Sequence, residues 1–168
     1  MYLRFTIMIF GDNFKPSKMV NNLETSLEVT DYFDVGEEDE FGEINDYGCL
    51  VVNHKNEFSK EYWDSEYEQE FVDFFRKNHQ LLRLNNADDL RIFIEAYYSD
   101  QCNFEIFNSE LLVELAKYKV SLPISVYYCD NDWYHIFNMF IKNLHNSTGY
   151  YEYEAFLEVI LQWMILLL

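Results

Sequence analysis

The sequence predicts an α+β fold: a largely antiparallel sheet with helices on one face, followed by a C-terminal helical hairpin. Short segments rich in β-branched and aromatic residues recur through residues 1–130. Helical patterns interrupt these segments without a regular strand–helix alternation, which favours α+β over α/β. Residues 131–168 show helical patterns alone. We therefore expect an α+β domain over 1–130 and a hairpin over 131–168, packed on that domain or on a second subunit.

The first half of the predicted domain contains three strands. Residues 2–10 form the first strand, which ends at a Gly-Asp-Asn turn. A short helix is expected next, because Pro16 suits a first helical turn and apolar residues follow at helical spacing. Residues 26–35 form a weakly marked second strand, and residues 47–53 form the third.

The longest helix is predicted to begin after Ser59, a good N-cap residue. Its apolar residues recur every three or four positions and define a core-facing side. These residues are Trp63, Tyr67, Phe71, Phe74, Phe75 and Leu82. The opposite face is predicted to carry the acids Glu61, Asp64, Glu66, Glu68, Glu70 and Asp73.

The second half of the domain starts with a strand over residues 91–98. A short extended piece over 104–107 leads to Asn108 and Ser109, which are suited to cap a helix. The side chains expected to point inward from that helix are Leu111, Leu112, Leu115 and Ala116. Residues 122–129 are the last predicted strand, with a proline tolerated near its start.

The end of the chain is strongly apolar. A helix capped by Asp132 is followed by a final helix over about 151–168, whose last part has only Glu158 and Gln162 as polar members. That apolar part spans roughly 21 Å, short of a hydrocarbon core of about 30 Å, so no membrane span is expected. Such a helix has to be covered, either by its own sheet or by a second copy of the chain in a homodimer.

The composition limits the partners that the chain can take. Thirty acids against twelve bases give a formal net charge of −18 over 168 residues. This charge argues against nucleic acid or an anionic membrane as a direct ligand and favours a basic protein. The cysteines Cys49, Cys102 and Cys129 form no close pair, and no signal peptide is visible. We expect reduced thiols and a cytoplasmic protein.

Motifs for chemistry are missing from the sequence. There is no phosphate-binding glycine loop, no nucleophile elbow and no metal-ligand spacing among the histidines. The acidic segment 34–46 does not place acids and glycine as a calcium-binding loop requires. We therefore expect no catalytic residue, no metal and no cofactor, and a protein that works by binding.

The candidate partner-binding site is acidic. Between Met19 and His54 there is no Lys or Arg but ten acids. Clustered acids focus an electric field and speed association with a basic partner, whereas the plain alternative is a solvated surface that keeps the chain in solution. The predicted site residues are Asp34, Glu37, Glu38, Asp39, Glu40, Glu43 and Asp46 in the loop, with Glu66 and Glu70 on the long helix.

Two segments resemble a known family. The stretch GDNFKPSKMVNNL after the first strand, and NFEIFNSELLVELAKYKVSLPISVYY at residues 103–128, are similar to domain-of-unknown-function family 4279 over about residues 1–130. Members are small bacterial proteins, and some look like cytoplasmic immunity proteins encoded beside toxins. The resemblance implies no catalytic residues. The chain departs from the family at Lys15, where an acidic cap is usual, in its acidic middle, and in its two C-terminal helices.

Three functions remain open on this basis. The first is an immunity protein that neutralises a cognate bacterial toxin, a basic nuclease, by occluding its active site. The second is an acidic nucleic-acid mimic that blocks a DNA-binding or defence protein, and charge spread along a rod would favour it. The third is a small-ligand-binding regulatory domain, which a deep apolar pocket would favour. One concave or protruding acidic patch would favour immunity.

Overall fold

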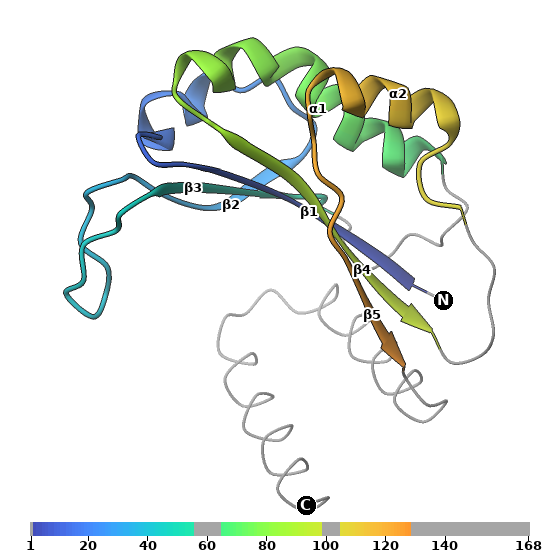
Figure 1. Cartoon of the computed structure of the whole chain (residues 1–168), viewed down its shortest axis with the longest axis horizontal. Helices are drawn as coiled ribbons and strands as arrows, with labels where there is room; N and C mark the ends of the chain where they lie inside the picture. Colours follow the sequence, from blue (N-terminus) through green and yellow to red (C-terminus); the bar gives the residue numbers. More distant parts are fainter. Residues whose placement is uncertain (1, 56–64, 99–104, 129–168) are drawn as a thin grey trace, which may run out of the picture. The chain divides into compact units, whose positions relative to one another are not determined.

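The computed structural model describes residues 2–55, 65–98 and 105–128, all within one compact unit, Met1–Asp130. The predicted cap Ser59, the acids Glu61 and Asp64, Trp63 and the C-terminal hairpin over 131–168 lie outside the described residues. The described part is an α+β structure in which two helices cover one face of a sheet (Figure 1).

The sheet has five strands in the order β2-β3-β1-β4-β5. These are β1 (Tyr2–Gly11), β2 (Glu28–Phe33), β3 (Gly48–Asn53), β4 (Asp89–Tyr98) and β5 (Ile124–Tyr128). Three of the four pairings are antiparallel, and β5 alone runs parallel to its neighbour β4. The prediction of a largely antiparallel sheet is therefore confirmed.

Strand β1 is the middle strand of the sheet. Its alternate residues are apolar and fill the space between the sheet and the helices. Phe5, Ile7 and Ile9 have no exposed surface, and their neighbours across β3 and β4 are buried on the same face. Helix α1 (Ser65–Leu84) packs on this face. Its predicted inward residues Tyr67, Phe71, Phe74, Phe75 and Leu82 are all buried, which confirms the helical periodicity. The ring of Phe5 lies 5.2 Å from that of Tyr67 and 5.3 Å from that of Phe71.

A buried amide ties α1 to the segment before β2. Asn78 is 1% exposed and accepts a hydrogen bond from the Glu24 backbone nitrogen at 2.9 Å. Its Nδ2 donates to the carbonyls of Glu24 at 3.0 Å and Phe74 at 2.8 Å. This bonding fixes where β2 starts relative to the helix, because leaving these buried groups unpaired would be costly.

Helix α2 (Ser109–Lys117) begins as expected. The side-chain oxygen of Asn108 accepts hydrogen bonds from the backbone nitrogens of Glu110 and Leu111, which confirms the predicted cap. Leu111 and Leu115 are buried as predicted, but Leu112 and Ala116 are exposed. The prediction was wrong for these two because a helix this short turns only a narrow stripe toward the core.

Other local expectations need correction. The predicted short helix after Pro16 consists of two 3₁₀ turns, Pro16–Lys18 and Val20–Asn22, and Lys15 provides no side-chain cap. The described part of the predicted extended piece, 105–107, is a bend in which Phe107 has φ 55° and a fully buried ring. Glu68, assigned to the exposed face of α1, is buried, and burial raises the pKa of its carboxyl.

Cys49 on β3 is buried and unbridged, as expected for a reduced thiol, and burial raises its pKa to about 11. The other two cysteines lie outside the described residues. None of the helices in the described part of the chain is long and apolar enough to cross a membrane.

Candidate functional site

The acidic segment between β2 and β3 is a hairpin-shaped loop with one isolated antiparallel bridge between Glu38 and Ile44, and we call it the acidic hairpin (residues 34–46). The backbone nitrogen of Gly36 donates to the Asn45 carbonyl at 2.8 Å, and that of Asn45 donates to the Glu37 carbonyl at 2.9 Å. Further out, the Asp39 nitrogen donates to the Glu43 carbonyl at 2.8 Å. The sequence predicted a loop here, and these bonds make that loop a defined projection (Figure 1).

Two glycines and one carboxylate shape the turn of the acidic hairpin. Gly36 and Gly42 both have φ 81°, a conformation that other residues adopt only at a cost. Asp39 Oδ1 accepts hydrogen bonds from the backbone nitrogens of Phe41 at 2.9 Å and Glu43 at 2.8 Å. Asp39 therefore holds the tip in place, as aspartate commonly does in turns.

The base of the acidic hairpin is tied to the turn after β1. The carboxylate of Asp34 accepts hydrogen bonds from the Ser17 nitrogen at 3.0 Å and from Ser17 Oγ at 2.6 Å. Glu37 Oε2 accepts from the Asp34 nitrogen at 2.9 Å. The Val35 nitrogen donates to the Phe14 carbonyl at 3.2 Å. Asp34, Glu37 and Asp39, three of the predicted site residues, thus build the hairpin.

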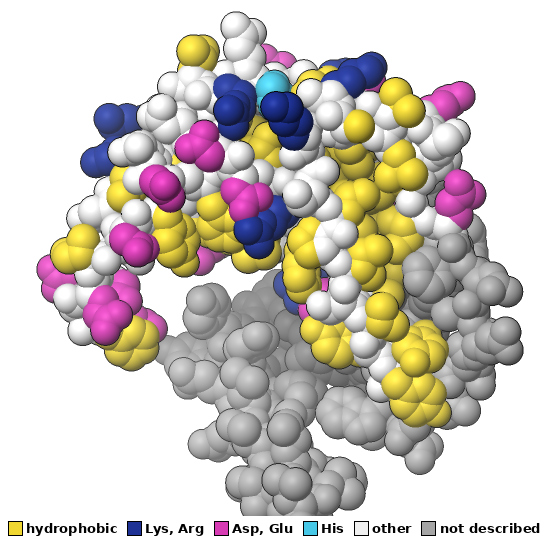
Figure 2. Space-filling view, viewed as in Figure 1, with side chains coloured by type: hydrophobic (Ala, Val, Ile, Leu, Met, Phe, Trp, Pro, Cys, Tyr) yellow, Lys and Arg dark blue, Asp and Glu magenta, His cyan; other side chains and the backbone are white. Residues whose placement is uncertain are grey.

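The remaining predicted loop residues form its charged surface. Glu38, Glu40, Glu43 and Asp46 are exposed. Within the described ranges none of these four carboxylates takes part in an ion pair. Figure 2 shows acidic side chains gathered on the hairpin, at the left of the view. Their charge is therefore available to a partner.

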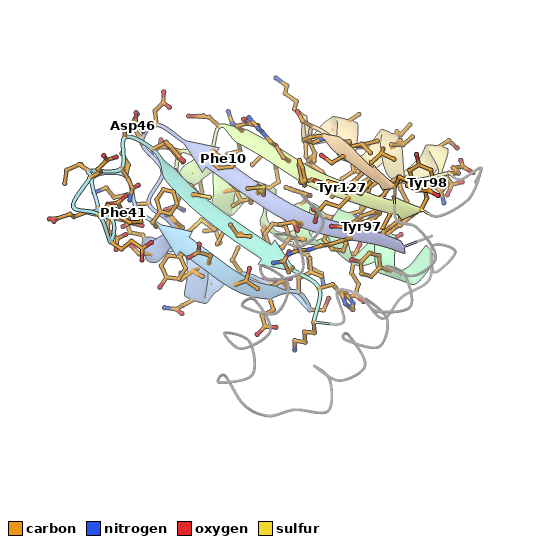
Figure 3. The ribbon with its side chains drawn as sticks, turned by 90° about the horizontal axis from the view of Figure 1, so that it is seen from below. Phe10, Phe41, Asp46, Tyr97, Tyr98 and Tyr127 are labelled. Atoms are coloured by element: carbon orange, nitrogen blue, oxygen red, sulfur yellow. The ribbon has the colours of Figure 1, made fainter. Side chains whose placement is uncertain are left out.

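An apolar tip accompanies these acids, and the sequence pattern did not predict it. Phe41 is 82% exposed and Ile44 is 63% exposed, and Figure 3 shows Phe41 out on the hairpin, away from the sheet. The only signal in the sequence is a phenylalanine between Glu40 and Gly42, inside a charged segment with no apolar periodicity. An exposed aromatic residue on an ordered projection is typical of an interface.

Of the two predicted residues on the helix, Glu70 does not join this surface. Glu70 is half-buried; one oxygen accepts a hydrogen bond from Ser26 Oγ at 2.6 Å, and the other lies 3.3 Å from His54 Nε2. Ser26 precedes β2 whereas the acidic hairpin follows it, so Glu70 lies at the other end of that strand. Glu66 belongs to α1, but its side chain is not described.

A depression of about 380 Å³ lies at the base of the acidic hairpin, and we call it the aromatic depression. Its lining residues include Phe10, Asp12, Tyr47, Asp88, Asp89 and Arg91. The Tyr47 ring stands edge-on to Phe10 at 5.9 Å and to Phe33 at 5.5 Å. The Arg91 guanidinium lies over the Phe10 ring at 5.2 Å and pairs with Asp89, whose hydrogen bonds raise the pKa of Arg91. The segments that build this depression are far apart in the sequence, so no local pattern announces it.

No group of three or more His, Cys, Asp or Glu side chains in the described part of the chain is placed to hold a metal ion. No family model matches the chain, and neither the curated proteins nor the solved structures give a match. The resemblance to family 4279 therefore stays an interpretation of the sequence.

Proposed function

We propose that this chain is an acidic binding protein: a cytoplasmic immunity protein that neutralises a cognate toxin nuclease by covering its basic active site. The observation that carries the proposal is the acidic hairpin. It holds five exposed acids, of which only Glu37 bonds the hairpin backbone, and an exposed phenylalanine on a backbone fixed by internal hydrogen bonds.

Order in the hairpin matters for affinity. A partner that binds an already ordered projection does not have to offset the entropy of ordering it. The exposed acids attract a basic surface and speed its association. The Phe41 ring supplies apolar area for the centre of an interface, where charge alone contributes little.

A nuclease is the class of basic protein that fits best. Its active site binds a polyanion and is therefore lined with basic residues. An inhibitor with carboxylates on a narrow projection can enter such a cleft, whereas a nucleic-acid mimic would spread its charge along a rod. The concentration of exposed acids on one hairpin supports the first arrangement over the second.

The test uses the product of the reading frame adjacent to the one that encodes this chain, which we call the candidate partner. Its nuclease activity is titrated with the full chain, and inhibition should saturate near one protomer per partner. Absence of inhibition at several-fold excess contradicts the proposal. Turnover of a substrate by small amounts of this chain, abolished by one carboxylate substitution, would instead make it an enzyme.

Two variants test whether the acidic hairpin is the surface that inhibits the candidate partner. Asp39 and Glu37 are left intact because they carry hydrogen bonds of the hairpin. The hairpin variant carries Glu38→Gln, Glu40→Gln, Glu43→Gln and Asp46→Asn. The control variant removes the same charge from exposed positions outside the hairpin, with Glu24→Gln, Glu28→Gln, Asp31→Asn and Glu110→Gln. The hairpin variant should inhibit at least tenfold more weakly than the control variant.

A further inference from the structure

The aromatic depression combines rings and carboxylates in a way that suits a planar cation. Phe10 and Tyr47 form aromatic walls, and Asp12, Asp88 and Asp89 add carboxylates around them. Its volume of about 380 Å³ is in the lower range of ligand pockets, which fits one side chain better than a large molecule.

The depression already holds a guanidinium of this chain. Arg91 lies over the face of Phe10 at 5.2 Å while Asp89 binds its nitrogens. This pairing of ring face and carboxylate is what a guanidinium selects, because the group is flat and weakly hydrated. Beside this occupied face, the Tyr47 ring and the exposed Asp12 carboxylate offer a second guanidinium a ring and an acid. A lysine ammonium would be held less well there, since it cannot make a bidentate contact with a carboxylate.

The charge of the region still favours a cation. Arg91 is matched by Asp89, and Arg83 reaches Asp88 at 3.5 Å across an exposed contact. Asp12 is exposed, and Asp46 of the acidic hairpin directly precedes Tyr47 in the chain. Figure 3 shows Phe10 and Asp46 at the same end of the sheet.

We infer that the aromatic depression is the anchoring site for one arginine side chain of the basic partner. The arginine enters beside Tyr47, which is 41% exposed, while the acidic hairpin contacts the partner's basic surface next to it. This inference rests on the proposed function and adds to it a preference for arginine over lysine.

The test compares two labelled peptides, octa-arginine and octa-lysine, whose dissociation constants for the full chain are measured by fluorescence anisotropy at fixed salt. An exposed cation–π contact changes an affinity by a factor of about two to five, so the chain should bind octa-arginine tighter by about that factor. Equal dissociation constants of the two peptides for the unmodified chain overturn the inference.

Variants are needed because arginine binds carboxylates better than lysine on many acidic surfaces. Tyr47→Leu keeps the apolar bulk but removes a ring, and Asp12→Asn with Asp88→Asn removes two carboxylates. Both variants should bring the ratio close to one, whereas the matched pair Glu24→Gln with Glu28→Gln should leave it unchanged. If Tyr47→Leu and the double variant Asp12→Asn with Asp88→Asn both keep the preference for octa-arginine, the inference is overturned.

The experiments distinguish a failure of the arginine-anchoring site from a failure of the proposed inhibitory function. The hairpin variant should weaken both peptides by a similar factor and keep the ratio, because its charges attract any cation. A lost arginine preference with intact inhibition of the candidate partner removes the anchoring site only. Failure to inhibit the candidate partner removes the proposed function, whatever the peptides do.

Discussion

Phe41 is the residue whose position says most about what the acidic hairpin is for. Its ring is 82% exposed and adds nothing to the core, while Asp39 holds the backbone on either side of it. A large apolar side chain held in water on an ordered turn stabilises a complex when it becomes buried there.

Phe41→Ser should therefore separate binding from folding. We expect the free energy of unfolding to change by less than about 0.5 kcal/mol, and the affinity for the candidate partner to fall by about 2 kcal/mol. Urea unfolding and a binding titration measure the two quantities. Leu84→Ser is the matched control, since Leu84 is 75% exposed at the end of α1. Equal affinities of the two variants would remove Phe41 from the interface.

Glu68 presents the opposite case, an acid that folding buries. Burial is the main reason that its pKa lies above the ordinary carboxyl value, and the charge of Glu105 raises it further. The folded chain therefore binds this proton more tightly than the unfolded chain does. The stabilising contribution of Glu68 is complete at pH below the ordinary carboxyl pKa and is lost as the pH rises through the folded pKa.

Glu68→Gln should reveal that loss. The amide is neutral at every pH and its oxygen can still accept the hydrogen bond from the Phe107 backbone. We expect the variant to be more stable than the unmodified chain at pH 7 and similar to it near the acid end of the range. Urea unfolding at a series of pH values gives the difference. A difference that does not change with pH would mean that Glu68 titrates normally.

At the scale of elements, Gly48 joins β3 to the base of the acidic hairpin. A Cβ on Gly48 would lie 2.0 Å from the Phe14 carbonyl oxygen, the same oxygen that accepts the Val35 nitrogen. No side chain fits there unless the segment after β1 moves away. Gly36, by contrast, has open space around its missing Cβ and needs only a positive φ.

Two alanine substitutions separate these requirements. Gly48→Ala should lower the free energy of unfolding by about 2–3 kcal/mol, because it forces backbone apart in a packed region. Gly36→Ala should lower it by about 1 kcal/mol, the cost of the left-handed conformation. Chemical unfolding of both variants measures the costs. Equal losses would show that the contact with Phe14 is not a close one.

The elements also show what a sequence can predict. Apolar spacing identified the core face of α1 from Tyr67 to Leu82, and the Asn108 cap placed α2, because both depend on neighbours within a few residues. The parallel pairing of β5 and the burial of Glu68 depend on distant parts of the chain. The acidic hairpin lies between these cases: its charge was visible and part of its order comes from bonds within it, but its base is also held by Ser17 and Phe14, which are distant in the sequence.

At the scale of the whole molecule, a net charge of −18 acts on stability as well as on binding. Like charges repel more strongly in the compact state, and salt screens that repulsion. Raising NaCl from about 0.01 M to about 0.3 M, which shortens the screening length severalfold, should increase the free energy of unfolding. The hairpin variant, with four charges fewer, should show a smaller increase. A loss of stability with salt would mean that attractive ion pairs dominate instead.

The most direct measurement of the central claim is the association rate constant with the candidate partner, followed by stopped flow over a range of ionic strengths. The hairpin variant and the control variant have the same net charge, so only the position of the removed charge differs between them. We predict that the hairpin variant associates at least tenfold more slowly at low salt and depends less on ionic strength, while the control variant stays close to the unmodified chain. Equal slowing of the two variants would contradict the account, because the partner would then sense the total charge and not the acidic hairpin.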